Sequence, residues 1–349
     1  MDLFTLTNIL SFFLSILIFF SIVGLGNLIN NKFLKINSIN YYEGFITGIF
    51  FVIFYLQIHI LIFPIDFYKS ILFLGLLIYG FIYSLKSLSM KISYKLIISL
   101  VLCFLLILNS SIFPYYNSIF DYGLYHNTYL NWLNQSNITL GLANLHYRFG
   151  YTGSSYLLGA FFNFYPYLNN GYVLTTSIFY IFLIFFFINN FDTDKNDFLN
   201  FYNLFILYVI LKYILVESLG DVSPSKIIFC LLIYIFYNLI KNYRLKFENN
   251  YLNILLVTSI LITLSPSTWF ISILIITYMF FRKFLKVRNF KIIIILGLIL
   301  CCNYALLNFL KSGNIFYPII FPVIETKFTI YNDYALYHIK NFPKGYPEG

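Results

Sequence analysis

Long apolar runs constrain this chain more than any other feature of its sequence. A helix that crosses a bilayer needs about 20 predominantly apolar residues. Polar segments separate runs of this kind, a few of them shorter, at 8–29, 45–64, 67–85, 93–113, 170–190, 199–217, 225–241, 251–265, 267–282 and 291–310. Charged residues make up 10% of the chain, whereas soluble domains carry roughly 25%. We therefore predict an all-α integral membrane protein with about ten transmembrane helices.

The basic residues predict which helix ends face the cytoplasm. The formal net charge is +9, but the lysines and arginines lie in short loops between apolar runs. The positive-inside rule explains such a pattern, so no nucleic-acid partner is implied. Lys32 and Lys35 follow the first run, and Lys86 and Lys91 follow the third. Both loops are expected to be cytoplasmic, which puts the N-terminus and residues 114–152 outside.

One apolar piece, residues 153–165, is too short to cross comfortably and is followed by Pro166. If it crossed, the basic loops at 241–246 and 282–291 would lie outside, against the rule. We therefore expect it to lie along the outer face as a juxtamembrane helix. Four polar clusters then share that face: 114–169, 217–226, 265–268 at the tip of a tight hairpin, and 311–349.

The longest polar interruption runs from Asp121 to Tyr156. Asp121 follows the fourth apolar run, and His126 lies close behind it. A carboxylate among basic groups at a membrane face suits a general base. An aspartate ahead of a short helix also suits an N-cap, so both catalysis and capping stay open for Asp121.

The segment 125–134 within this interruption has an amphipathic pattern. In a helix, Tyr125, Tyr129, Trp132 and Leu133 would share one face. Trp and Tyr are common at the headgroup level of membranes. We expect this helix to place the loop at the interface and to take no part in the chemistry.

Polar and apolar residues alternate in Asn144–Phe149. If this segment is extended, Asn144, His146 and Arg148 project to one side. An amide, an imidazole and a guanidinium fork suit a phosphate or pyrophosphate. The alternative is a loop arginine that contacts lipid headgroups.

Further charged residues lie in the later outer loops. Glu217, Asp221 and Lys226 flank Ser223-Pro224-Ser225, and Lys311 follows the last apolar run. A second acidic loop could bind a divalent metal or the acceptor, or it could be a solvated turn in which Pro224 starts a helix. All four cysteines fall inside apolar runs, where they suit neither a loop disulfide nor a metal site.

The loop sequences resemble a known family. The runs DYGLYH (121–126), NWL (131–133), GLANLHYRFGYTGSSY (141–156) and SGNIFYP (312–318) are similar to loop motifs of bacterial polytopic membrane proteins that are recorded as uncharacterised. That family in turn resembles the GT-C class of membrane glycosyltransferases, which includes protein mannosyltransferases, oligosaccharyltransferases and lipid A aminoarabinose transferases. The match to the uncharacterised family covers about residues 93–330 and is most specific in the first loop, whereas the more remote resemblance to the GT-C class rests mainly on layout.

The resemblance implies a domain division and a site. Residues 1–92 would be additional N-terminal transmembrane helices, 93–310 a GT-C-like core with the outer loop 114–169, and 311–349 a periplasmic C-terminal segment. Asp121 would deprotonate the acceptor, and the donor would be a polyprenyl-phosphate-linked sugar that enters from the lipid bilayer. Two departures stand out. Relatives carry an Asp after the Ser-Pro element where this chain has Ser225 and Lys226. The class also continues further after its core, which leaves room for truncation or a partner subunit.

Three functions follow as hypotheses. The first is transfer of a sugar to a glycan or lipid acceptor at the periplasmic face of a bacterial inner membrane, with substrate or phosphate bound by His126, Asn144, His146, Arg148, Lys226 and Lys311. The second is a surface-polysaccharide polymerase or ligase, which would depend more on Arg148 and His146 than on Asp121. The third is a transporter or flippase, which would need a polar path inside the spans, where this chain has few polar residues.

Overall fold

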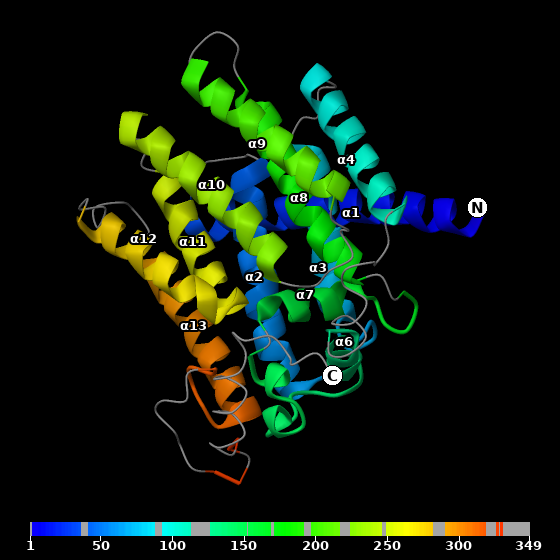
Figure 1. Cartoon of the computed structure of the whole chain (residues 1–349), viewed down its shortest axis with the longest axis vertical. Coiled ribbons are helices and arrows are strands. Elements are labelled where there is room, and N and C mark those ends of the chain that lie inside the picture. The colour runs from blue at the N-terminus through cyan, green and yellow to red at the C-terminus, as the bar shows by residue number, and fades with distance from the viewer. Residues whose placement is uncertain are drawn as a thin grey trace, which may run out of the picture.

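The computed structural model (Figure 1) describes residues 2–35, 41–87, 93–112, 126–151, 153–168, 171–191, 197–216, 224–245, 249–281, 290–318, 326–327 and 329–330. Within these ranges every regular element is helical. The α-helices are α1 (Asp2–Ile29), α2 (Tyr41–Ile62), α3 (Ile71–Ser87), α4 (Tyr94–Ile112), α6 (Asn127–Gln135), α7 (Ser154–Phe162), α8 (Gly171–Asn190), α9 (Asp197–Val216), α10 (Pro224–Leu245), α11 (Asn249–Leu264), α12 (Trp269–Phe281) and α13 (Phe290–Ser312). Shorter turns are the π-helix η1 (Asn30–Leu34) and the 3-10 helices η3 (Leu142–Asn144), η4 (Tyr147–Tyr151) and η5 (Pro266–Thr268).

Helix α8 is the centre of the bundle. It packs against α1, α2, α4, α7, α9 and α10, and all its side chains from Ile178 to Phe187 are buried. Phe45 of α2 stacks on Phe182 with ring centroids 4.7 Å apart. A helix that is apolar on every side suits this position, because each of its faces meets another helix.

Glycines bring the first three helices into close contact. A Cβ atom placed on Gly24 of α1 would lie 1.8 Å from the carbonyl oxygen of Gly80 in α3, and one on Gly26 would lie 1.8 Å from that of Gly44 in α2. Small residues let helix backbones approach in this way, which is common where helices pack within lipid. The predicted domain boundary at 92/93 stays a prediction, although α2 also packs against α7, α8, α11 and α13.

Two lysines mark one end of the bundle, called the basic end below. Lys95 Nζ donates to the carbonyl oxygen of Phe191 at 2.7 Å, and Lys241 Nζ donates to Asn190 Oδ1 at 3.1 Å. Both ammonium groups therefore lie at the C-terminus of α8, where the helix dipole favours positive charge. Because Lys95 begins α4 and Lys241 lies near the end of α10, α10 runs in the same direction as α8, and α4 runs opposite to both.

The opposite end, called the loop end, carries the short helices α6 and α7 (Figure 1). The backbone N–H of Ile138 donates to Ile60 at the end of α2 at 3.0 Å, and that of Gly141 donates to Leu310 at the end of α13 at 3.0 Å. The segment that follows α6 thus lies across the ends of two long helices.

The predicted apolar runs all form helices, with ends that differ by a few residues. Among the described residues, five helices are long and apolar enough to cross a membrane: Ile9–Leu34, Tyr41–Ile62, Val173–Asn190, Pro224–Lys241 and Lys291–Ser312. The other predicted runs form shorter apolar helices. Helix α7 has only nine residues, which confirms that 153–165 forms no full span. Helix α13 continues through Lys311 and Ser312, just past the predicted run 291–310.

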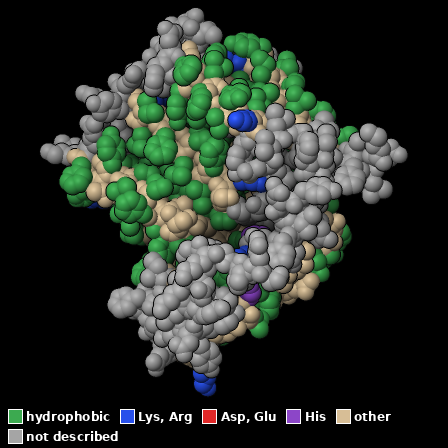
Figure 2. Space-filling model, in the orientation of Figure 1, with side chains coloured by type: hydrophobic (Ala, Val, Ile, Leu, Met, Phe, Trp, Pro, Cys, Tyr) green, Lys and Arg blue, Asp and Glu red, His purple; other side chains and the backbone are tan. Residues whose placement is uncertain are grey.

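Large hydrophobic side chains are exposed on the outside of the bundle. Leu72 of α3 is 85% exposed, Phe201 of α9 69% and Phe281 of α12 78%. Figure 2 shows hydrophobic side chains over the helical part of one face, with histidine and basic side chains near a hollow below it. Soluble monomers rarely expose apolar surfaces of this kind. The chain is therefore a multi-pass membrane protein whose helices contact the bilayer.

Candidate functional site

Asn134 fixes α6 at the loop end. Its Nδ2 donates to the carbonyl oxygens of Ile65 at 2.6 Å and Ala160 at 2.9 Å, and its Oδ1 accepts from Asn163 Nδ2 at 2.9 Å. Asn163 Oδ1 in turn accepts from the backbone N–H of Gly171 at 3.1 Å. These buried bonds join the ends of α2 and α7 and the start of α8 to α6. The Asn134 side chain is 1% exposed, so this polar residue lies on the buried side of α6.

A second contact joins the loops that follow α2 and α7. The hydroxyl groups of Tyr68 and Tyr167 share a hydrogen bond, and this bond raises the pKa of Tyr167. Nearby, a Cβ atom on Gly153 would lie 1.8 Å from the carbonyl oxygen of Leu264, so the start of α7 touches the end of α11. The loop end is therefore packed and not a set of separate loops.

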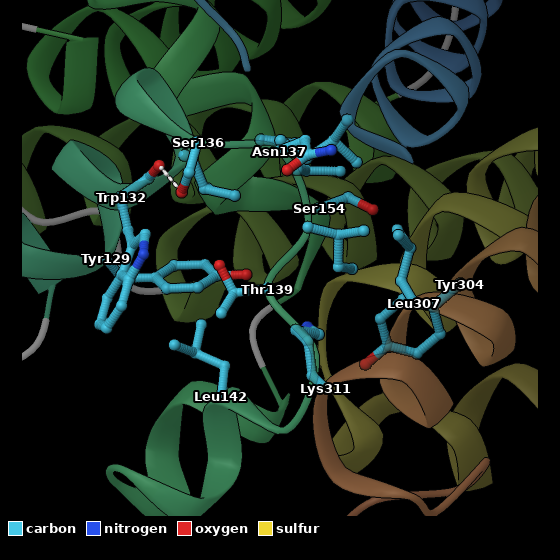
Figure 3. Close-up of a pocket in the computed structure, with 14 residues that line it drawn as sticks. Tyr129, Trp132, Ser136, Asn137, Thr139, Leu142, Ser154, Tyr304, Leu307 and Lys311 are labelled. Carbon is cyan, nitrogen blue, oxygen red and sulfur yellow. Dashed lines mark hydrogen bonds between the residues drawn. The ribbon is translucent and has the colours of Figure 1, made fainter. Parts of the chain in front are cut away.

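The loop end also contains a pocket (Figure 3), which is lined by residues of α2, α6, α7, α13 and the segment after α6. Its walls leave about 430 Å³ of empty space, which includes the open mouth. The polar lining consists of hydroxyl, amide and ammonium groups from Ser136, Asn137, Thr139, Ser154, Tyr304 and Lys311. The remaining lining is aromatic and aliphatic: Ile60, Tyr129, Trp132, Leu133, Ile138, Leu142, Leu157 and Leu307. An apolar pocket with a few convergent polar groups is the usual form of a small-molecule site.

Lys311 supplies the one amine among the described residues that line this pocket. It lies in the last turn of α13, and its side chain is 3% exposed. Its Nζ lies 5.9 Å from the centroid of the Tyr129 ring, within the range of a cation–π interaction. Burial of an ammonium group costs free energy that nearby partners must offset. The sequence analysis expected a cation in the outer loop, whereas the structure places it inside a helix-bounded pocket.

Aromatic rings connect Lys311 to two of the predicted histidines. The Tyr129 ring packs edge-on against Tyr156, with centroids 5.5 Å apart, and Tyr156 Oη shares a hydrogen bond with His126 Nδ1. The Tyr129 ring also stacks on Phe149 with centroids 5.8 Å apart, and the Phe149 ring contacts the His146 ring at 5.5 Å. His126 and His146 therefore lie behind the pocket wall, and neither lines it directly.

Arg148 lies beside this group, in η4. Its Nε donates to Tyr147 Oη at 3.0 Å, and its backbone N–H donates to His146 Nδ1 at 3.3 Å. The predicted extended conformation of 144–148 was wrong, because η3 and η4 are 3-10 turns. The turns bury Tyr147 against Tyr317, whose Oη donates to the Tyr147 carbonyl oxygen at 3.0 Å.

The remaining predicted residues are not brought to the pocket. Asn144 ends η3 and is exposed, and Lys226 lies buried in the first turn of α10 without lining the pocket. Asp121, Glu217 and Asp221 lie outside the described residues. Their predicted roles therefore stay predictions.

The described part of the chain contains no group of three His, Cys, Asp or Glu side chains close enough to hold a metal ion. The carboxylates expected at such a site are Asp121, Glu217 and Asp221, which are not among those residues. The divalent metal stays a prediction, and no step below is routed through one.

One protein-family model matches most of this chain. The family model of the domain of unknown function DUF8201 matches residues 9–344. The chain belongs to the DUF8201 family. Neither the curated proteins nor the solved structures give a significant match. The DUF8201 match begins within α1 and extends past α13, so the N-terminal helices and the pocket belong to one family unit.

Sequence reasoning about this DUF8201 chain missed several pocket residues. Tyr129 and Trp132 were expected only to place the loop, yet both line the pocket. Ser154 and Tyr304 were missed because each lies inside an apolar run. One signal was readable: Tyr304, Asn308 and Lys311 are spaced to share a single face of a helix.

Proposed function

We propose that this protein is a membrane glycosyltransferase. It would move a sugar from a polyprenyl-phosphate donor to a glycan or lipid acceptor at the periplasmic face of a bacterial inner membrane. The proposal includes ten transmembrane helices with a GT-C-like core and an outward-facing loop end. The observation that supports it best is the Lys311 ammonium inside a pocket lined by aromatic rings and hydroxyl groups.

The composition of the pocket suits the head of such a donor. A phosphate that is linked to lipid and sugar carries one negative charge beside an apolar chain and a hydroxylated ring. Lys311 offers the countercharge. Ile60, Leu133 and Leu157 offer apolar walls, while Ser136 and Thr139 offer hydroxyl groups. A binding site for a purely apolar ligand would not need the ammonium, whose burial is costly.

The proposed reaction needs a base and a stabilised leaving group. The base takes the proton of the acceptor hydroxyl, and the acceptor oxygen bonds to C1 of the sugar on the side opposite the phosphate. The bond from C1 to the phosphate oxygen breaks, and its electron pair leaves with the polyprenyl phosphate. Asp121 is the base predicted from the sequence. Lys311 stabilises the charge that develops on the departing phosphate.

The orientation rests on the basic end. Lys95 and Lys241 at the C-terminus of α8 suit the cytoplasmic side under the positive-inside rule. The pocket lies at the opposite end, which is then periplasmic. A lipid-linked donor would reach it from the outer leaflet.

Transfer of radiolabelled sugar from undecaprenyl-phosphate-linked hexoses in isolated membranes tests the proposal. We expect Asp121→Asn to lower transfer by about 100-fold or more, because general base catalysis contributes 10²–10⁴-fold. Arg148→Ala is expected to have the smaller effect. The reverse order would favour a polymerase or ligase that acts on a pyrophosphate-linked glycan. Full transfer by Asp121→Asn would contradict the assignment of the base.

A further inference from the structure

Helix α13 carries a polar face that leads inward from the pocket. Tyr304, Asn308 and Lys311 follow at helical spacing on one face, and their side chains are 3%, 0% and 3% exposed. The rest of this helix consists mainly of apolar residues with exposed Ile292, Ile295 and Leu298. Polar side chains buried within a membrane helix usually face a partner helix or a functional cavity. Tyr304 and Lys311 both line the pocket.

The Tyr304 hydroxyl group lines the wall of the pocket that α13 forms, and it can hydrogen-bond to a ligand. Among the described residues, Tyr304 Oη has no hydrogen-bond partner, although the residue is almost fully buried. Buried hydroxyl groups are nearly always hydrogen-bonded to protein, water or ligand. A phenol that lines a pocket and makes no close hydrogen bond within the described part of the chain is therefore placed to bond with a ligand that enters.

Ser154 offers a second hydroxyl on another wall of the pocket. Gln57 Nε2 donates to Ser154 Oγ at 3.2 Å, and both side chains are buried. Because Ser154 Oγ accepts this bond, its own O–H can donate into the pocket. Figure 3 shows Ser154, Tyr304 and Lys311 around one space, with Tyr129 on the opposite side. The hydroxyl groups and the ammonium thus belong to different parts of one lining.

We infer that the pocket has two parts with different ligand chemistry. Lys311 binds the phosphate, while Tyr304 and Ser154 bind hydroxyl groups of an attached neutral sugar. The pocket then recognises a lipid-linked sugar phosphate and discriminates against the bare lipid phosphate, which is the product left after transfer. This inference rests on the proposed function, and it adds which residues recognise the sugar.

Two observations favour a neutral sugar over a second charged group. The described lining contains one ionisable cation and no carboxylate. Its other polar groups are hydroxyls and an amide, which both donate and accept hydrogen bonds, as sugar hydroxyls do. A site built to hydrogen-bond substrate hydroxyls rejects analogues that lack them, because its buried polar groups are left unpaired.

Native mass spectrometry of the detergent-purified full chain tests the inference. The probes are undecaprenyl phosphate and undecaprenyl phosphate carrying glucose, galactose or mannose. The wild-type protein is expected to bind at least one sugar-bearing probe about tenfold more tightly than the bare phosphate, since two extra neutral hydrogen bonds have roughly that effect.

The variants separate the two parts of the pocket. Tyr304→Phe and Ser154→Ala are each expected to reduce the preference to about threefold and to leave binding of undecaprenyl phosphate nearly unchanged. Ser155→Ala is the matched control, because Ser155 is an equally buried neighbour that does not line the pocket. Lys311→Met is expected to weaken binding of every probe by a similar factor.

The outcomes distinguish this inference from the proposed function. Equal binding of bare and sugar-bearing probes, all dependent on Lys311, overturns the inference and leaves the proposed function standing. A preference that survives both Tyr304→Phe and Ser154→Ala also overturns it. If no probe binds, or if Lys311→Met leaves the affinity of every probe unchanged, the result counts against the proposed function itself.

Discussion

The ammonium of Lys311 lies 5.9 Å from the ring centroid of Tyr129, which joins the last turn of α13 to the short helix α6. This contact connects two segments that are far apart in the chain. Tyr129 in turn packs on Tyr156 and Phe149. The charge of the pocket is therefore held by an aromatic cluster that α6, η4 and α7 build together. Whatever disturbs these three elements should disturb Lys311 as well.

Asn134→Leu is expected to destabilise the loop end by about 3 kcal/mol, because it leaves two buried carbonyl oxygens and the Asn163 amide without partners. The measurement is SDS titration of the purified protein in mixed micelles. Gln135→Leu is the control, since Gln135 is the next residue and is exposed. It should change stability by at most about 0.5 kcal/mol. Equal effects of the two substitutions would show that the Asn134 hydrogen bonds contribute nothing.

Gly313→Ala is expected to loosen the end of α13. Gly313 has φ +75°, and a Cβ atom would lie 2.5 Å from Thr329 Oγ1. We expect a loss of about 2 kcal/mol from the left-handed conformation and the clash. The same substitution should also weaken binding of anionic lipid, since Lys311 lies two residues earlier. The same SDS titration measures the stability change.

Gly75→Ala is the control for that substitution. A Cβ atom there would meet nothing within 4 Å, and the residue lies in α3. Because alanine favours helix more than glycine does, Gly75→Ala should leave stability unchanged or raise it by up to about 1 kcal/mol. If Gly313→Ala is as harmless as Gly75→Ala, neither the left-handed conformation of Gly313 nor its close approach to Thr329 contributes to stability.

Membrane orientation can be tested with single cysteines. The background is Cys301→Ser/Cys302→Ser, because the other two native cysteines, Cys103 and Cys230, are buried. Leu140→Cys at the loop end should react with a membrane-impermeant maleimide in intact spheroplasts. Lys35→Cys, in the loop that the sequence predicts to be cytoplasmic, should react only after permeabilisation. Both positions are exposed in the structure. The opposite pattern of labelling would place the pocket in the cytoplasm.

The helices were predictable from the sequence because apolar runs of bilayer length have few alternatives to helix. The short length of α7 and the tight α11–α12 hairpin followed from the same runs. In that hairpin, Thr268 Oγ1 donates to Leu261 and Trp269 Nε1 donates to Ile262. Helix ends were less predictable. Lys311 was assigned to a loop because it is charged, yet α13 continues to Gly313, where a positive φ ends it.

The pocket was only partly predictable. Lys311 was selected for its charge and does line the pocket, whereas Arg148 and His146 were selected from an alternation that the structure does not form as a strand. Burial of Tyr147 and Phe149 determines the backbone conformation of that segment. This burial depends on contacts with residues far away in the sequence, such as Tyr317. Ser154 and Tyr304 also lacked a local signal. Their role depends on which helices meet at the loop end.

The most direct test of the account compares two lysines that each lie over an aromatic ring at the loop end. Lys311 Nζ lies over Tyr129 inside the pocket, and Lys69 Nζ lies 5.5 Å from the centroid of Phe63 at an exposed position.

The measurement is the affinity of undecaprenyl phosphate for the purified wild-type, Lys311→Met and Lys69→Met proteins, with the unfolding temperature of each. We predict that Lys311→Met weakens binding by about tenfold or more, as expected when a charged hydrogen bond is lost. Its unfolding temperature should not fall, because a buried charge is removed. Lys69→Met should bind as the wild type does. Equal affinities of all three proteins would contradict the assignment of this pocket to a lipid-linked phosphate.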